Sequence, residues 1–297
     1  MNPIRTLVLL VGCTAATSCS SANLPESQKL SPEKIAGIAS HIESQYPKLS
    51  QEKRDEVLRT VVRSLDEMVF IEGGSFEMGD FGWKCDFDPA EVCTWPCGAP
   101  EDNLCNITRD SEDGPHRVGL ASYHLAAKKT TLGDFRPLPV GAWKGTRAQR
   151  ATASRRSAVP VRSWEYAARD RGKNILYPTN DGSLKLGKNF PYDEEMQQIS
   201  SRVDAFPPNP LGLYLMSGGA TEYVNDWYSD SYYAESANQV DPKGPETGEE
   251  KVARGTDMVD TPWLAANTVI RRNQALVLDK HYLTRSFRCA LNTGEMM

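Results

Sequence analysis

Residues 206–228, FPPNPLGLYLMSGGATEYVNDWY, constrain the fold more than any other stretch of the chain. They contain three prolines, three glycines and five aromatic residues, and their apolar positions follow neither a helical nor a strand period. Clustered glycine and proline interrupt regular structure, and the whole chain holds 22 glycines and 19 prolines. The sequence therefore predicts an irregular, loop-rich α+β fold in which long loops join short elements.

The size and charge of the chain exclude some functions. Its 297 residues suffice for one large domain or two small ones. The formal net charge is −5, so the electrostatics give no general reason to expect nucleic acid as a partner.

Residues 1–19 have the features of a bacterial lipoprotein signal peptide. MNPIR carries one arginine, TLVLLVG is apolar, and small polar residues follow up to a cysteine. The apolar run is too short to span a bilayer as a helix. We favour Cys19 as the lipidated residue because it leaves a signal of more usual length. Cys13 follows the better lipobox, and a plain secretory signal is a third interpretation.

All three interpretations predict a protein that is exported from the cytoplasm. Serine or threonine, not aspartate, follows either candidate cysteine. This favours an outer-membrane lipoprotein that faces the periplasm and contacts the membrane through its N-terminal lipid.

Residues 20–66 are predicted to form a tether and a helical hairpin. Ser31 and Ser50 are each placed to cap a helix, and Pro32 takes the favoured first position of the first one. Apolar residues recur at helical spacing after both caps, at Ile35, Ile38, Ile42, Val57, Leu58, Val61, Val62 and Leu65. We interpret His41, on the first helix, as a solvated side chain and not a ligand.

Four cysteines, Cys85, Cys93, Cys97 and Cys105, lie close together in KCDFDPAEVCTWPCGAPEDNLC. Their spacing lacks the two close pairs that are usual at zinc sites, whereas an oxidising periplasm favours disulfides. We predict two disulfides that staple a loop with little apolar material, and zinc is the alternative. The sequence does not separate the three pairings, and it leaves Cys289 as the odd cysteine.

Short strands and one short helix are predicted after Met68. MVFIEGGSFEMGD indicates a hairpin around Gly-Gly, and HRVGLASYHLAAKKTT is typical of a strand. SWEYAAR indicates a short helix, and KVARGTDM and RSFRCAL indicate strands near the end of the sequence.

Together these segments resemble the formylglycine-generating enzyme, or sulfatase-modifying factor, family. MVFIEGGSFEMGD is similar to the family's opening strand motif, and EDGPHRVGLASYHLAAKKTTLGDF to its next block. SWEYAAR matches its Glu-Trp-Glu-Tyr-Ala-Ala-Arg helix, and residues 206–228 match its Asn-x-x-Gly-Leu-x-x-Met block that ends in Asp-Trp-Tyr. VARGTDM and FRCAL match its last two strands. The resemblance implies a domain over residues 67–297 with the family's loop-rich fold, which is related to C-type lectin-like folds.

The resemblance implies calcium in the turn region as a cofactor. Glu222 matches a calcium-binding glutamate of the family, and carboxylate and amide oxygens suit this hard cation. Gly219 stands where the family has an asparagine, so one side-chain ligand is missing. Asn189, in GKNFPYDEE, lies where a second family calcium site begins. The alternative for Glu222 is a polar residue that is satisfied within a packed turn.

The resemblance also indicates that the family's catalytic chemistry is absent. The two thiols that hold copper in catalytic members fall on Asp260 and Ala265 here. Soft thiolates suit Cu(I), and ordinary substitutions do not replace them. We therefore assign no catalytic residue and expect no copper. The clustered cysteines are far from these positions in sequence order.

Two kinds of relative use the fold differently. Ergothioneine-type sulfoxide synthases bind iron through three histidines, mostly from an added helical domain. Of His41, His116, His124 and His281, only His41 lies in the helical segment of this chain. A pyoverdine-maturation type of relative works in the periplasm without the cysteine pair, and it keeps an enzymatic interpretation open.

Residues 136–162, RPLPVGAWKGTRAQRATASRRSAVPVR, depart from the family pattern. The family has a longer segment there, with a Val-Ser-Trp helix and a Leu-Pro-Thr-Glu turn. The stretch is interpreted as a true deletion, as a disturbance of the reading frame, or as a basic loop for an acidic partner.

The leading hypothesis is a periplasm-facing lipoprotein whose domain is non-catalytic and binds a protein. The partner would be a secretion-system component or a toxin that the lipoprotein neutralises. The alternative is a metal-dependent oxidase or other modifying enzyme of the same family. Converging His, Cys or carboxylate groups around Asp260 would favour the enzyme, and an apolar or aromatic groove would favour binding.

Overall fold

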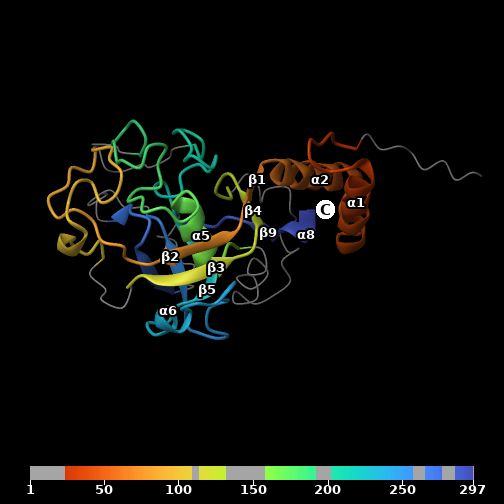
Figure 1. The fold of residues 1–297 in the computed structure, drawn as a ribbon. Helices are drawn as coiled ribbons and strands as arrows, with labels where there is room; N and C mark the ends of the chain where they lie inside the picture. The colour runs from red at the N-terminus through yellow and green to blue at the C-terminus, as the bar shows by residue number, and fades with distance from the viewer. Residues whose placement is uncertain are drawn as a thin grey trace, which may run out of the picture.

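Short helices and strands joined by long loops make up the molecule (Figure 1). The computed structural model describes residues 24–108, 114–131, 158–191, 202–256, 265–275 and 285–296. Its helices are α1 (Pro32–Gln45), α2 (Gln51–Asp66), η1 (Glu101–Asn103), α5 (Val161–Ala168), α6 (Tyr232–Glu235) and α8 (Thr293–Met296). Its strands are β1 (Met68–Ile71), β2 (Gly74–Met78), β3 (His116–Leu120), β4 (Tyr123–Ala126), β5 (Thr221–Trp227), β6 (Glu250–Arg254), β7 (Arg271–Ala275), β8 (Arg285–Ser286) and β9 (Ala290–Asn292).

Several residues of the sequence predictions lie outside these ranges. They are Cys13, Cys19, Asp260, His281 and most of the stretch 136–162. The lipid site and the first position of the family's cysteine pair therefore stay predictions.

The helices α1 and α2 form the pair that the sequence predicts. The side chains of Ser31 and Ser50 accept hydrogen bonds from the backbone N–H groups of Lys34 and Lys53. The apolar residues of both helices form a small core of their own, of Leu30, Ile35, Ile42, Val57, Leu58 and Val62. His41 is exposed, as expected. None of the described helices is long and apolar enough to cross a membrane.

The hairpin predicted within MVFIEGGSFEMGD is wrong. β1 pairs with β4 and β2 pairs with β3, so the two halves of this segment do not pair with each other. The register is continuous, from Met68 opposite Ala126 to Met78 opposite His116. The two glycines mark a bend in one long antiparallel ribbon, where the Gly73 N–H bonds to the Ser122 hydroxyl at 2.9 Å. A side chain on Gly73 would meet the Leu120 carbonyl oxygen at 2.3 Å, which explains why glycine stands there.

A second sheet has the strand order β7-β6-β5-β8, and α5 packs between it and the ribbon. The predicted helix in SWEYAAR is confirmed as α5, and every one of its residues from Arg162 to Ala168 is buried. Trp164 and Tyr166 belong to the main core, with apolar residues of the ribbon and of β5 and β6. The observed architecture is thus the irregular α+β fold that the sequence predicts.

Residues 84–108, here called the disulfide lobe, contain two disulfides, as predicted. Cys85 pairs with Cys105, and Cys93 pairs with Cys97 inside that loop. Cys289 is outside both disulfides. In Figure 1 the lobe, in orange to gold, lies at one end of the molecule, and the helices α1 and α2 lie at the other. The end of the chain that carries the predicted tether is therefore far from the disulfide lobe.

Candidate functional site

A pocket of about 720 Å³ lies between the disulfide lobe and the loop that follows α5. The lobe side consists of Trp83 and of residues 92–95. The opposite side consists of residues 173–176 and 179–182, together with Pro210. The volume is within the usual range of small-ligand and side-chain pockets.

An apolar cluster that shares Trp83 and Leu176 with the pocket lies next in the chain to the second family cysteine position. Ala266 is fully buried in a cluster with Trp83, Leu176, Tyr177, Leu184 and Phe190, and Cys93, Trp95 and Cys97 pack against it. Its neighbour Ala265, the residue at the cysteine position, is 4% exposed. The cysteines of the lobe were far from this position in sequence order, but the fold brings the Cys93–Cys97 loop into the same cluster.

Backbone hydrogen bonds join the segment after Ala266 to the pocket. The Thr268 N–H donates to the Leu176 carbonyl at 2.9 Å, and the Thr268 hydroxyl donates to the Ile175 carbonyl at 2.7 Å. Both carbonyl groups belong to pocket residues, so the segment that follows Ala266 is hydrogen-bonded to the pocket wall.

A buried ionic group, here called the Glu165 cluster, supports the same wall. Glu165 is fully buried, and one oxygen accepts from Gly79 N–H and from Arg169, each at 2.9 Å. The other oxygen accepts from Arg254 at 2.9 Å and from the Tyr233 hydroxyl at 3.0 Å. One carboxylate is thus shared by two buried guanidinium groups, an arrangement that is stable only with full hydrogen bonding.

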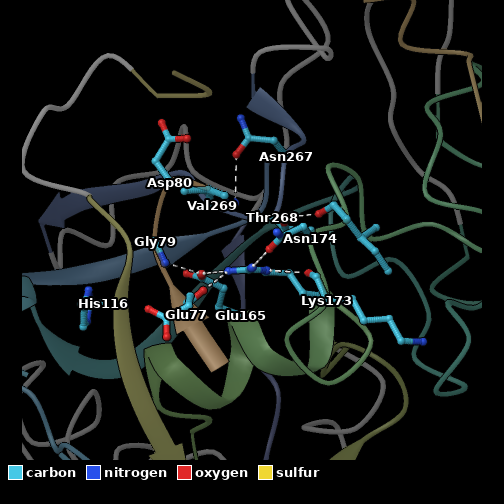
Figure 2. Close-up of polar contacts among 12 residues, drawn as sticks. Glu77, Gly79, Asp80, His116, Glu165, Lys173, Asn174, Asn267, Thr268 and Val269 are labelled. Carbon is cyan, nitrogen blue, oxygen red and sulfur yellow. Dashed lines mark hydrogen bonds and ion pairs between the residues drawn. The ribbon is translucent and has the colours of Figure 1, made fainter. Parts of the chain in front are cut away.

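The guanidinium groups connect this cluster to residues of the pocket wall; Figure 2 shows Glu165 with Gly79 on one side and Lys173 and Asn174 on the other. Arg169 donates to the Lys173 carbonyl at 2.9 Å and to the Asn174 side chain at 2.8 Å. Arg254 donates to the carbonyl oxygens of Thr268 and Val269. Burial lowers the pKa of Arg169 from its usual value, and Glu165 opposes that shift. The cluster fixes the backbone of both segments behind the pocket.

Glu222 lies in a second buried group, here called the Glu222 cluster. Arg288 donates to both of its carboxylate oxygens at 3.0–3.1 Å, and Trp164 Nε1 donates to Oε2 at 2.9 Å. The Lys129 ammonium lies 3.3 Å from Oε1, and its side chain is 3% exposed. Glu222 itself is fully buried.

This arrangement does not fit calcium at Glu222. A calcium ligand needs a carboxylate lone pair directed at the ion, but two cations and an indole N–H already occupy both oxygens of Glu222. The Lys129 ammonium supplies the positive charge there. The polar, packed interpretation of Glu222 accounts for these contacts.

Asn189 shows a similar pattern. Its side-chain oxygen accepts from the Lys185 N–H at 2.7 Å, and its amide donates to Asp181 and to the Ser183 carbonyl. The Lys185 ammonium lies 2.8 Å from the other oxygen of Asp181. Hydrogen bonds to Lys185 and Ser183 lower the pKa of Asp181 and outweigh its partial burial. Again a lysine stands beside the carboxylate where the resemblance implies calcium.

The histidines of the described residues do not meet at the pocket. His116 packs on Tyr233 and bonds to Ser236, and His124 lies beside Phe70 on β4. Within the described ranges, no group of three or more His, Cys, Asp or Glu side chains is arranged to hold a metal ion.

Comparison with known proteins gives the family. Residues 151–292 match the model of the sulfatase-modifying factor enzyme 1-like domain. The bovine formylglycine-generating enzyme is 34% identical over 103 residues, which are 31% of this chain and 27% of that enzyme. Residues 151–292 therefore form a domain of the sulfatase-modifying factor family. The family model covers SWEYAAR and the later blocks, and the lobe side of the pocket lies before the matched residues.

Two further similarities extend beyond that match. The serine/threonine-protein kinase pkn1 of Chlamydia pneumoniae is 28% identical over 257 residues, 77% of this chain and 38% of the kinase. The chain spans roughly a third of the length of the curated relatives that it matches. The structure of PvdO from Pseudomonas aeruginosa has a TM-score of 0.50 at 19% identity, over 76% of this chain and 94% of PvdO. This likeness establishes a shared fold over 76% of the chain.

Sequence reasoning missed most of the residues that shape this site. Trp83 was not singled out, Trp95 appeared only within the cysteine-rich segment, and Arg254 and Arg288 only as parts of strand motifs. One available signal was the Glu165–Arg169 pair in SWEYAAR. An acid and a base four residues apart on an otherwise apolar helix indicate a buried ion pair.

Proposed function

We propose that the chain is a non-catalytic member of the sulfatase-modifying factor family that binds a protein partner. One observation carries the proposal: Ala265, at the second cysteine position, is a buried methyl group beside an aromatic cluster. A methyl group offers copper no ligand, whereas apolar and aromatic surface is what a binding pocket uses.

The same proposal includes the anchor. A lipid on Cys19 would attach the chain to the periplasmic face of the outer membrane, with calcium not required for the fold. In Figure 1 the disulfide lobe, which supplies one side of the pocket, and the helices α1 and α2 lie at opposite ends of the molecule, which supports a lobe held away from the membrane. A secretion-system component or a toxin stays the proposed kind of partner. Kinase activity is not carried over from the Chlamydia relatives, because the chain spans only 38% of the kinase pkn1 of Chlamydia pneumoniae.

The test of the non-catalytic role is a turnover assay. Purified protein is incubated with a cysteine-containing sulfatase peptide, copper, oxygen and a reductant, and the peptide mass is followed. We expect no conversion to formylglycine, with a catalytic family member as the positive control. Turnover that is lost on Asp260→Ala would refute the proposal and favour the metal-dependent oxidase.

The anchor is tested by cell fractionation. Cys19→Ala should release the protein from the membrane fraction, because the lipid is the proposed attachment. Cys13→Ala is the matched control and should stay membrane-bound. If Cys13→Ala is released and Cys19→Ala stays membrane-bound, the lipid site is Cys13. If both variants stay membrane-bound, the lipid-anchor proposal is refuted.

A further inference from the structure

We propose that the pocket beside the disulfide lobe takes a basic protein segment that inserts one large apolar side chain between the lobe side, with Trp83 and Trp95, and the opposite wall, with Ile175 and Leu176. This inference rests on the proposed binding function and names the chemistry of its partner. Three features carry it: the shape of the pocket, its rigid walls and the charge of the lobe.

Apolar groups gather on both sides of the pocket. Trp83, Val92 and Trp95 line the lobe side, and Ile175, Leu176 and Pro210 are among the residues opposite. Val92 is 58% exposed, one of few large apolar side chains that the described residues expose to this extent. A volume of about 720 Å³ accommodates an aromatic side chain together with its flanking backbone. Such an anchor would cover Val92 and contact both tryptophans.

The walls of the pocket are fixed before any partner binds. Trp95 Nε1 donates to the Gly82 carbonyl at 3.1 Å, and the Cys93–Cys97 disulfide closes the loop that carries Trp95. The opposite wall is held from behind by Arg169 and Thr268 through the hydrogen bonds given above. A rigid pocket loses little conformational entropy on binding, which favours an inserted side-chain anchor.

The charge of the lobe selects a basic partner. Residues 84–108 contain one lysine and five carboxylates, a formal charge of −4. The carboxylates all belong to residues classed as exposed, at Asp86, Asp88, Glu91, Glu101 and Asp102. Lys84 pairs with Glu91 at 2.8 Å, so it does not offset the other four. The pocket lining itself carries one lysine and one carboxylate, Lys173 and Asp181, so the charge bias comes from the lobe. Lysine or arginine that flanks the anchor and faces the lobe would meet complementary charge, which raises the association rate and disfavours acidic segments.

The lobe side also separates this pocket from the matched family domain. Trp83 and residues 92–95 precede the matched range 151–292. One side of the pocket, five of its fourteen lining residues, is therefore built by a part of the chain that the family model does not describe. The partner is accordingly argued from this chain's own side chains.

The experiment uses the mature chain and three fluorescein-labelled peptides. Lys-Lys-Gly-Trp-Gly-Lys-Lys is the probe, Lys-Lys-Gly-Ser-Gly-Lys-Lys lacks the anchor, and Glu-Glu-Gly-Trp-Gly-Glu-Glu reverses the charge. Fluorescence anisotropy gives the three dissociation constants. We expect the probe to bind roughly tenfold or more tightly than either control, because a buried tryptophan anchor and complementary charge each contribute to affinity.

Variants of the chain locate the binding. Trp95→Ala should weaken probe binding roughly tenfold or more. Val92→Lys, at an exposed rim position, should weaken it without unfolding the lobe. The joint change Asp86→Lys and Asp102→Lys should weaken it and reduce its dependence on salt. Phe70→Ser is the matched control, since this exposed aromatic side chain lies on β1 and should leave binding unchanged. Non-reducing mass spectrometry confirms both disulfides in every variant.

Three outcomes would overturn the inference. They are no binding of the probe, equal binding of the serine or glutamate peptide, and binding that Trp95→Ala and Val92→Lys leave intact. Sedimentation of the unliganded chain gives a fourth: a dimer that Val92→Lys dissociates would make a second copy the occupant. The turnover assay is independent, because conversion of a cysteine peptide would refute the non-catalytic role and leave the pocket's preference standing.

Discussion

Replacing Glu222 with glutamine should destabilise the protein strongly. The change leaves two buried cations, Lys129 and Arg288, without the carboxylate that lies within 3.3 Å of both. Removal of one partner from a buried ion pair usually costs about 3–5 kcal/mol. Because two cations lose their partner here, we expect a cost of about 4–5 kcal/mol, a large share of an ordinary domain's stability.

A second substitution tests whether charge is the cause. Lys129→Met removes one cation, keeps much of the apolar stem, and leaves the Ala220 carbonyl without its ammonium donor. Alone it should cost about 1–3 kcal/mol. Combined with Glu222→Gln, it should raise stability by about 1–2 kcal/mol over Glu222→Gln alone, because one uncompensated cation remains in place of two.

The assay is urea unfolding at 25 °C, followed by tryptophan fluorescence, with the m-value as a check on two-state behaviour. Glu246→Gln, at an exposed position, is the control and should change the free energy of unfolding by less than about 0.5 kcal/mol. Additive costs in the double variant would show that Lys129 and Glu222 are not coupled. A cost below about 1 kcal/mol for Glu222→Gln would refute the electrostatic account of the cluster altogether.

Three further predictions concern other parts of the molecule. Loss of the Cys85–Cys105 disulfide, which spans 20 residues, should destabilise the protein by about 3 kcal/mol, and loss of Cys93–Cys97, which spans 4, by about 2 kcal/mol. Urea unfolding of the two double Cys→Ser variants measures both costs, and a larger cost for the shorter loop would contradict the loop-entropy reasoning. Burial raises the pKa of Asp226 to about 6, so the native state binds a proton more tightly than the unfolded state and stability falls as pH rises from about 4 to about 6. The free energy of unfolding of Asp226→Asn, relative to that of the parent chain, should therefore rise by about 2–3 kcal/mol as the pH goes from 4 to 7. If the stability of both proteins depends on pH with the same slope, this account of Asp226 is excluded. Removal of calcium with EGTA should leave the melting temperature unchanged within about 1 °C, whereas a bound ion at 100 times its dissociation constant would contribute about 2.7 kcal/mol.

Local signals predicted the elements of this fold better than their partners. Ser31 and Ser50 marked both helix starts correctly, since a cap acts within one turn. The pairing of MVFIEGGSFEMGD was wrong because Gly-Gly suits a bend as well as a turn. The partner strand, with Leu120 opposite Gly74, lies far along the chain. Distant pairing leaves no local trace in a short strand.

The site was harder to predict for a related reason. The resemblance located Glu222 and Ala265, but the meaning of each depends on residues far away in the sequence. Lys129 and Arg288 decide that Glu222 is a structural carboxylate. Trp83 links Ala266, the neighbour of Ala265, to the pocket, because it belongs to both the apolar cluster and the pocket lining. Neither partner stands out in a single sequence, because lysine, arginine and tryptophan have many other uses.

The two lysine-paired carboxylates bear on why a pocket can exist at this position. A lysine ammonium lies at both positions where the resemblance implies calcium: Lys129 pairs with the buried Glu222, and Lys185 pairs with Asp181 beside Asn189. Covalent and ionic links of the chain itself therefore support both sides: disulfides in the lobe, and the Glu165 cluster behind the loop after α5. A wall supported in this way does not need the thiol pair of the catalytic family members. In the proposed non-catalytic role, absence of the thiols would remove the chemistry without removing the scaffold, and the aromatic side chains of the lobe would have a fixed surface on which to present a binding site.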